Sequence, residues 1–113
     1  MHAITLLHLD PKQRDIVRNV YVICYDICDQ KRYRQVYKAM CGHGDSLQYS
    51  VFRCELSDIE LHRLKDALWP ILNLSEDRVM LVNLGPAEGR GDECIEYWGN
   101  PRVSPSPRSA RIV

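Results

Sequence analysis

The fold is decided by one stretch, Val20-Tyr21-Val22-Ile23-Cys24-Tyr25-Asp26-Ile27, and by the polar run that follows it, Cys28-Asp29-Gln30-Lys31-Arg32-Tyr33-Arg34. The first run is almost wholly apolar and rich in β-branched and aromatic residues, which predicts a strand buried on both faces. A carboxylate in such a strand is costly unless it binds something. Asp26 is therefore the first candidate for function. A divalent metal is the partner we expect, because a hard metal held next to arginines is typical of phosphate chemistry.

The composition describes one compact domain. The chain has 113 residues, of which 45% are hydrophobic, and this is enough for a core and argues against disorder. The formal net charge is zero, so a nucleic-acid site would have to be a local basic patch. No apolar run is long enough for a membrane span, and the amino end lacks the pattern of an export signal. We therefore expect a cytoplasmic protein with no membrane partner.

The cysteines favour the same compartment. Their number is five, which is odd. Cys24, Cys28 and Cys54 lie in strand-like, apolar surroundings, where cysteine behaves as a small hydrophobic residue. We expect all of them to be reduced.

Two helices are predicted after the first strand. Asp29 occupies an N-cap position, and turn chemistry over residues 42–45 ends the first helix. The apolar stripe of that helix comprises Tyr33, Val36, Tyr37, Met40 and Cys41, and its basic side carries Lys31, Arg32, Arg34 and Lys38. Ser57 and Glu60 form a capping box that begins the second helix, and Pro70 ends or kinks it.

Three further extended stretches complete the pattern, at residues 47–56, 78–84 and 95–98. The first contains no Gly, Asn or Pro for a turn, so local physics predicts one long strand bent near Ser50. Alternation of helices and strands indicates an α+β fold with the helices on one face of a sheet. The expected organisation is an amino-terminal extension over residues 1–19, a main domain over 20–99 and a proline-rich tail over 100–113.

Two motifs together resemble those of a known family. The first is Tyr25-Asp26-Ile27 with Asp29 and the basic run over residues 31–34, and the second is Gly44 with Gln48-Tyr49-Ser50-Val51-Phe52. In their combined spacing the chain resembles the small CRISPR-associated nuclease of the adaptation module, the second Cas protein family, over about residues 20–99. The resemblance implies a ferredoxin-like βαββαβ plait with an extra carboxyl-terminal strand, in which residues 47–56 form two very short strands.

The resemblance also implies an assembly and an activity. It implies a homodimer in which carboxyl-terminal strands cross to the partner's sheet, and a phosphodiesterase that depends on Mg²⁺ or on another divalent metal such as Mn²⁺. The substrate is single-stranded RNA in some members and duplex DNA in others. The implied partner is the CRISPR integrase, the first Cas protein, during spacer acquisition. Many members carry an arginine just before the second motif, where this chain has Ser46 and Leu47.

Asp26 is the candidate catalytic residue and metal ligand. One carboxylate per chain is too little for a magnesium site, but a twofold axis would supply a second Asp26. A metal held there would lower the pKa of a bound water and offset charge on the phosphate. The alternative is that Asp26 caps a turn at the strand end. Asp29 is a further possible carboxylate ligand, although its N-cap position is a sufficient explanation.

The candidate nucleic-acid-binding residues are Lys31, Arg32 and Arg34. Arginine presents a fork that suits phosphate oxygens. The alternative is a solvated helix face. Ser50 and Phe52 of the second motif favour structural roles, in a strand bend and in the core.

Two functions of different class remain open at this point. One is a metal-dependent endonuclease centred on Asp26. The other is a catalytically silent adaptor that bridges integrase dimers on DNA, with basic side chains on the phosphate backbone. A toxin-like RNase with the same plait also fits, whereas a domain that binds a small molecule leaves Asp26 and the arginines unexplained.

Overall fold

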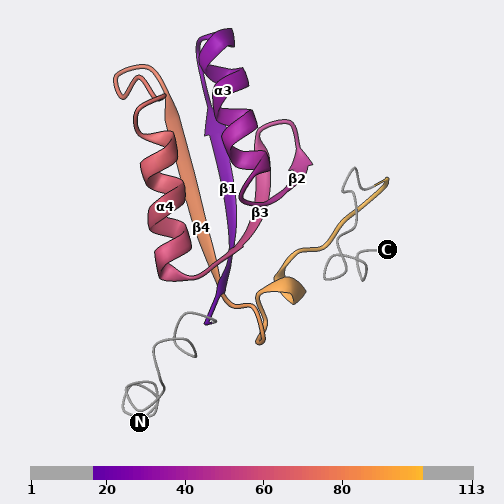
Figure 1. Cartoon of the computed structure of the whole chain (residues 1–113). Helices are drawn as coiled ribbons and strands as arrows, with labels where there is room; N and C mark the ends of the chain where they lie inside the picture. Colours follow the sequence, from indigo (N-terminus) through magenta and orange to yellow (C-terminus); the bar gives the residue numbers. More distant parts are fainter. Residues whose placement is uncertain (1–16, 101–113) are drawn as a thin grey trace.

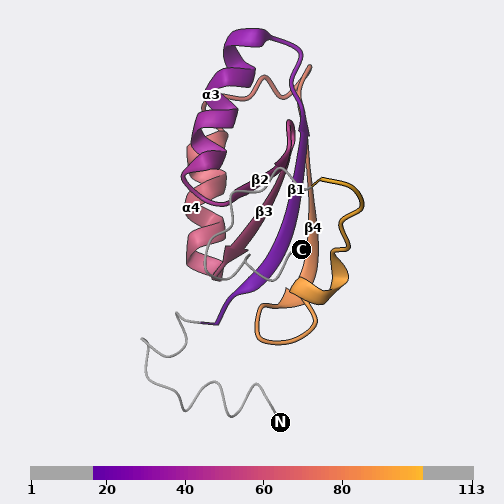
Figure 2. The same ribbon diagram turned by 90° about the vertical axis from the view of Figure 1, so that its right-hand side faces the viewer.

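The computed structural model of the chain describes residues 17–100 (Figure 1). Its elements are, in order, β1 (Asn19–Asp26), α3 (Gln30–Cys41), β2 (Asp45–Gln48), β3 (Val51–Leu56), α4 (Asp58–Leu68), β4 (Arg78–Pro86) and the 3₁₀ turn η1 (Asp92–Cys94). The strands form one antiparallel sheet in the order β2-β3-β1-β4. Both helices cover the same face of that sheet (Figure 2). This βαββαβ arrangement confirms the predicted α+β plait. Among the described residues, no helix combines the length and apolar content that crossing a membrane requires.

The core lies between the sheet and the two helices. Alternate residues of β1 face the helices, because side chains in a strand point to opposite faces in turn. The buried cluster comprises Tyr21, Ile23 and Tyr25 of β1, Phe52, Cys54 and Leu56 of β3, Val36 and Met40 of α3, and Leu64 and Leu68 of α4. Burial of one large apolar side chain contributes about 1.5–3 kcal/mol, so this single cluster carries most of the hydrophobic stabilisation.

The opposite face of the sheet, here called the open face, is only partly covered. On β1 it carries Val20, which is fully buried, and then Val22 and Cys24, which are half-buried, before the exposed Asp26. The prediction of a strand buried on both faces is therefore wrong for the carboxyl-terminal half of β1 in the single chain. The reason is that no described element packs over that end of the open face.

Residues 45–56 form a hairpin with a tight turn at Tyr49 and Ser50. The carbonyl oxygen of Tyr49 accepts hydrogen bonds from the hydroxyls of Tyr33 and Tyr25, at 2.9 and 3.3 Å. The carbonyl of Ser50 accepts from the backbone N–H of Tyr25 at 3.0 Å. The prediction of one bent strand is wrong because distant tyrosines, rather than local turn residues, stabilise this turn. The two short strands implied by the family resemblance are present.

Both predicted helix starts are confirmed. The carboxylate of Asp29 accepts from the backbone N–H of Arg32 at 2.9 Å, which is an N-cap hydrogen bond. Ser57 and Glu60 form the expected capping box, with reciprocal hydrogen bonds of 3.2 and 2.9 Å. Helix α4 ends just before Pro70, as the missing N–H of proline requires.

The chain after β4 turns back across the open face, on the side away from the helices (Figure 2). Gly91 is buried there, and a Cβ at this position would lie 2.8 Å from Cγ2 of Val20. Residues 95–98 have no ladder of hydrogen bonds within the described part of the chain, so the extra carboxyl-terminal strand, which the resemblance places on a partner's sheet, stays a prediction. The predicted extension over residues 1–19 and tail over 100–113 fall largely outside the described residues, so these boundaries stay predictions.

Gly44 offers a test of the packing between the hairpin and α3. A Cβ at Gly44 would press on the Cys54 sulfur and lie 2.5 Å from the carbonyl oxygen of Arg53. Displacing backbone atoms costs more free energy than moving the end of a flexible side chain. We therefore expect Gly44→Ala to lower the free energy of unfolding by about 1–3 kcal/mol in urea titrations. Gly42→Ala is the matched control, since its Cβ would come no closer than 3.4 Å to Ala39. Equal losses in both variants would contradict this account.

Candidate active site and nucleic-acid interface

Asp26 is the last residue of β1, and it is exposed on the open face. Its ladder partner is Arg78, the first residue of β4, so the two side chains lie on the same face. Among residues 17–100, no hydrogen bond or ion pair engages the Asp26 carboxylate. Nothing in this part of the chain therefore supports the turn-capping alternative. The Asp26 carboxylate remains available to a cation.

A metal site at Asp26 is incomplete within one chain. Among the described residues, no group of three or more His, Cys, Asp or Glu side chains could hold a metal ion. A carboxylate oxygen is the donor that Mg²⁺ prefers, so the chemistry of Asp26 fits, but the number of ligands does not. Further oxygen ligands would have to come from a second chain, from water or from a substrate.

A buried carboxylate fixes the loops beside Asp26. The side chain of Asp77 is 0% exposed, and its oxygens lie 2.8 and 3.1 Å from Nε and a terminal nitrogen of Arg32. Asp77 also accepts hydrogen bonds from the backbone N–H groups of Cys28 and Asn73, at 3.0 and 2.9 Å. Glu76 adds a second carboxylate, 3.0 Å from Arg32. This network joins the loop after β1 to the loop before β4.

The predicted basic residues consequently differ in availability. The guanidinium of Arg32 is engaged by Asp77 and Glu76, so its observed role is to anchor α3. Lys31 and Arg34 are exposed on the same helix. Asp29 caps α3, which is the explanation that its N-cap position in the sequence already offered.

Arg78 is a site residue that the sequence does not single out. It is the only charged residue of β4, and this is the one signal that could have revealed it. Its position beside Asp26 follows from the register between β1 and β4, which a sequence pattern does not specify.

The second motif has a structural role in this chain. Ser50 donates a hydrogen bond of 3.4 Å to the hydroxyl of Tyr33, next to the hairpin turn. Phe52 is completely buried and stacks on Tyr25. These positions agree with the structural roles favoured from the sequence.

The cysteines are all free in the structure. Cys54 is buried, and burial raises its pKa to about 12, so it behaves as a small hydrophobic residue as predicted. The prediction of an apolar environment is wrong for Cys28. That residue is exposed, and its thiol donates to the carbonyl of Glu76, because the strand ends before it.

The arrangement of the strands and of the two motifs agrees with the comparisons. The family described as CRISPR associated protein Cas2 matches residues 19–89, from β1 through the end of β4. The chain belongs to the Cas2 family. Its similarity to "CRISPR-associated endoribonuclease Cas2" of Geobacter sulfurreducens is 42% identity over 72 residues, covering 64% of this chain and 76% of the relative. Its similarity to "CRISPR-associated endoribonuclease Cas2 3" of Synechocystis sp. is 33% identity over 93 residues, covering 82% and 98%.

Solved structures agree with this membership of the Cas2 family. The Streptococcus pyogenes Cas2 structure at pH 6.5 matches with a TM-score of 0.62 and 26% identity, covering 71% of this chain and 99% of that one. A hypothetical protein from Thermus thermophilus, TT1823, gives the same TM-score and identity, and covers 74% and 94%. The family expected from the two motifs is thus confirmed.

The Asp77 network makes folding stability depend on acid. The Arg32 guanidinium, reinforced by the backbone N–H groups, holds the pKa of Asp77 below its ordinary range. Asp77 therefore stabilises the folded state above its ordinary pKa of about 3.9, and this contribution is lost as the pH falls through the lower pKa of the folded state. We expect Asp77→Asn to lower the melting temperature at pH 7 by roughly 5–10 °C.

Thermal unfolding followed by circular dichroism between pH 7 and pH 2 tests this. The native chain should lose stability below about pH 4 more steeply than Asp77→Asn, because only the native chain has this carboxylate to protonate. Asp66→Asn is the control, since Asp66 is exposed on α4. Parallel pH profiles for the native chain and Asp77→Asn would refute the assignment.

Proposed function

We propose that this chain is a metal-dependent endonuclease in which Asp26 of two chains forms the catalytic centre. The observation that carries the proposal is the exposed, unengaged Asp26 carboxylate at the edge of a partly apolar open face. Membership of the Cas2 family supports it, as do the names of relatives, which are CRISPR-associated endoribonucleases. These names favour RNA as the substrate, and duplex DNA is the second substrate to be tested.

A homodimer would supply the second Asp26. Beside Asp26 the open face carries Met80 and Val82 of β4, whose side chains are 55% and 40% exposed, next to the half-buried Val22 and Cys24. An exposed apolar patch of this kind favours contact with another protein surface. In a twofold dimer the same patch serves both chains, so one axis relates the two Asp26 residues, and their place beside the patch would bring them together.

In this mechanism the paired Asp26 carboxylates would hold a divalent metal, Mg²⁺ or Mn²⁺. When bound, the metal supplies a Lewis acid and lowers the pKa of a water. Arg78 places a guanidinium on the same face, where it can donate to phosphate oxygens. Lys31 and Arg34 extend the positive charge along α3, and the Arg32–Asp77 ion pair keeps the start of that helix in place.

The biological setting belongs to the same proposal. Residues 20–99 form the nuclease domain, the protein acts in the cytoplasm, and it takes part in spacer acquisition with the CRISPR integrase. The family match over residues 19–89 supports the CRISPR setting and most of the domain range. A catalytically silent adaptor that bridges integrase dimers is the competing outcome of the experiments below.

Asp26→Asn should abolish the activity without unfolding the protein. We expect cleavage of single-stranded RNA or duplex DNA in Mg²⁺ to fall by at least about 10²-fold, because the variant lacks the charge that holds the metal. The melting temperature should stay within about 2 °C of the native value, since Asp26 is exposed and unpaired among the described residues. Asp66→Asn is the control for loss of one surface carboxylate.

The same assay distinguishes the nuclease from the adaptor. Cleavage by the native chain should stop when EDTA replaces Mg²⁺. Full activity of Asp26→Asn would remove Asp26 from the mechanism. A native dimer that binds duplex DNA but cleaves neither substrate in Mg²⁺ or Mn²⁺ would be the adaptor.

Nucleic-acid binding should depend on the exposed basic residues of α3. Lys31→Ala and Arg34→Ala should each weaken binding and reduce the slope of log K against log salt by about 1. Lys38→Ala, near the other end of α3, should change neither quantity. Fluorescence anisotropy at several salt concentrations measures both. An unchanged slope in the two variants would show that this face does not contact phosphates.

A further inference from the structure

A buried arginine connects the sheet to the chain that follows β4. Arg53 lies on the open face of β3, opposite Val22, and its side chain is only 5% exposed. Its Nε lies 2.7 Å from Oδ1 of Asp92, while its terminal nitrogens lie 3.2 Å from Glu55 and 3.9 Å from Asp45. A guanidinium taken out of water needs such partners. Glu55 and Asp45 belong to the hairpin, so Asp92 is the partner that brings in another part of the chain.

Gly91 strengthens this connection by close packing. It is buried on Val20, and the approach is so close that a Cβ would clash with the Val20 side chain and make a tight contact with the carbonyl oxygen of Pro86. The turn that follows β4 is thus held at two adjacent residues, by van der Waals contact at Gly91 and by an ion pair at Asp92. Both contacts lie at the Val20 end of the open face, away from Asp26.

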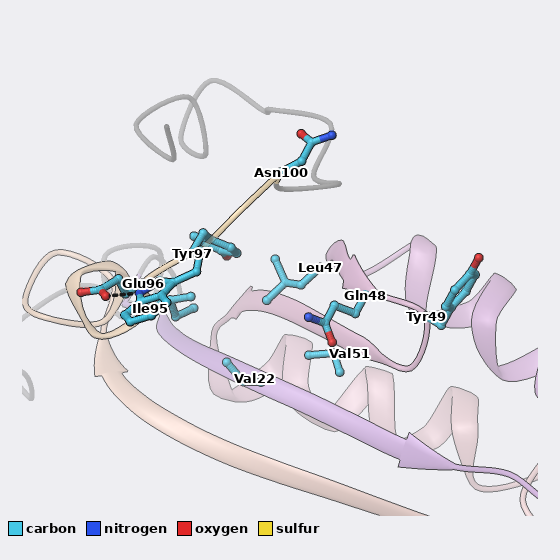
Figure 3. Close-up of a pocket in the computed structure, with 10 residues that line it drawn as sticks. Val22, Leu47, Gln48, Tyr49, Val51, Ile95, Glu96, Tyr97 and Asn100 are labelled. Carbon is cyan, nitrogen blue, oxygen red and sulfur yellow. Dashed lines mark hydrogen bonds between the residues drawn. The ribbon is translucent and has the colours of Figure 1, made fainter.

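Beyond the ion pair at Asp92, the segment contains a polar group that lacks a hydrogen-bond partner among the described residues. Residues 95–100 form one wall of a pocket of about 540 Å³, whose other wall includes Val22, Leu47 and Val51 (Figure 3). The hydroxyl of Tyr97 is buried and has no hydrogen-bond partner among the described residues. A buried donor without an acceptor is costly, so the contact of Tyr97 weakens the hold of this segment on the sheet. Trp98 is 88% exposed next to it.

We propose that the Arg53–Asp92 ion pair is a clasp that holds residues 91–98 across the open face and positions them against a second copy of this chain. The inference rests on the proposed homodimer and extends it. The clasp covers the Val20 end of the open face, so the end with Asp26 is the part left for a partner. Arg53 and Asp92 are therefore positioning residues that decide how two Asp26 residues meet, although they do not touch metal or substrate.

Hydrogen exchange of the full chain tests the clasp itself. In Asp92→Asn, amides of residues 91–98 should exchange at least about tenfold faster than in the native chain, whereas those of β1 should not change. Glu93→Gln is the matched control, because Glu93 is exposed next to Asp92. Asp92→Glu keeps the carboxylate and should retain most of the protection. Equal exchange in Asp92→Asn and the native chain would overturn the clasp.

Sedimentation velocity tests the consequence for assembly. The dimer dissociation constant should rise at least about tenfold in Asp92→Asn and not in Glu93→Gln. Cleavage by Asp92→Asn should recover at protein concentrations above that constant, whereas Asp26→Asn should stay inactive at every concentration. A native chain that remains monomeric would remove the proposed homodimer, while hydrogen exchange would still report on the clasp. Faster exchange with an unchanged dimer would overturn the positioning role.

Discussion

The buried carboxylate of Asp77 is the constraint on which the geometry near Asp26 depends. It accepts hydrogen bonds from the Arg32 guanidinium and from the backbone of two separate loops, so the end of β1 and the start of β4 are held together. Because a buried charge requires its partner, Arg32 is withdrawn from the solvent-exposed basic surface. The register that places Arg78 beside Asp26 begins directly after this network. The Arg32–Asp77 ion pair thus assigns Arg32 to the fold and leaves Lys31 and Arg34 at the surface of the same helix.

The two faces of the sheet are stabilised by different means. The helices of the same chain cover one face with a continuous apolar cluster. The chain after β4 attaches to the other face at Gly91 and Asp92, and the far end of that face carries apolar side chains together with Asp26 and Arg78. Such a surface is suited to a partner that offers the same groups in return. A second chain would therefore both add ligands to the metal site and cover the exposed part of the open face.

The sequence predicts those features that depend on neighbouring residues. The run that ends at Asp26, the cap at Asp29 and the capping box at Ser57 are local, and the structure has all of them. The hairpin at Tyr49 was beyond local rules because its turn is stabilised by hydroxyl groups from β1 and α3. The engagement of Arg32 likewise depends on a carboxylate far along the chain. Long-range pairings of this kind have no local signature, so the motifs identified the family but not the role of each charge.

The exposed indole of Trp98 gives the chain an intrinsic optical reporter. Indole emission shifts to shorter wavelength when water is removed, and Trp98 stands beside the pocket on the open face, where a second chain would exclude solvent. Trp69, the other tryptophan, lies at the end of α4 with Lys65 over its ring, and it supplies an internal reference. Self-association of the unlabelled chain can therefore be followed by its own fluorescence.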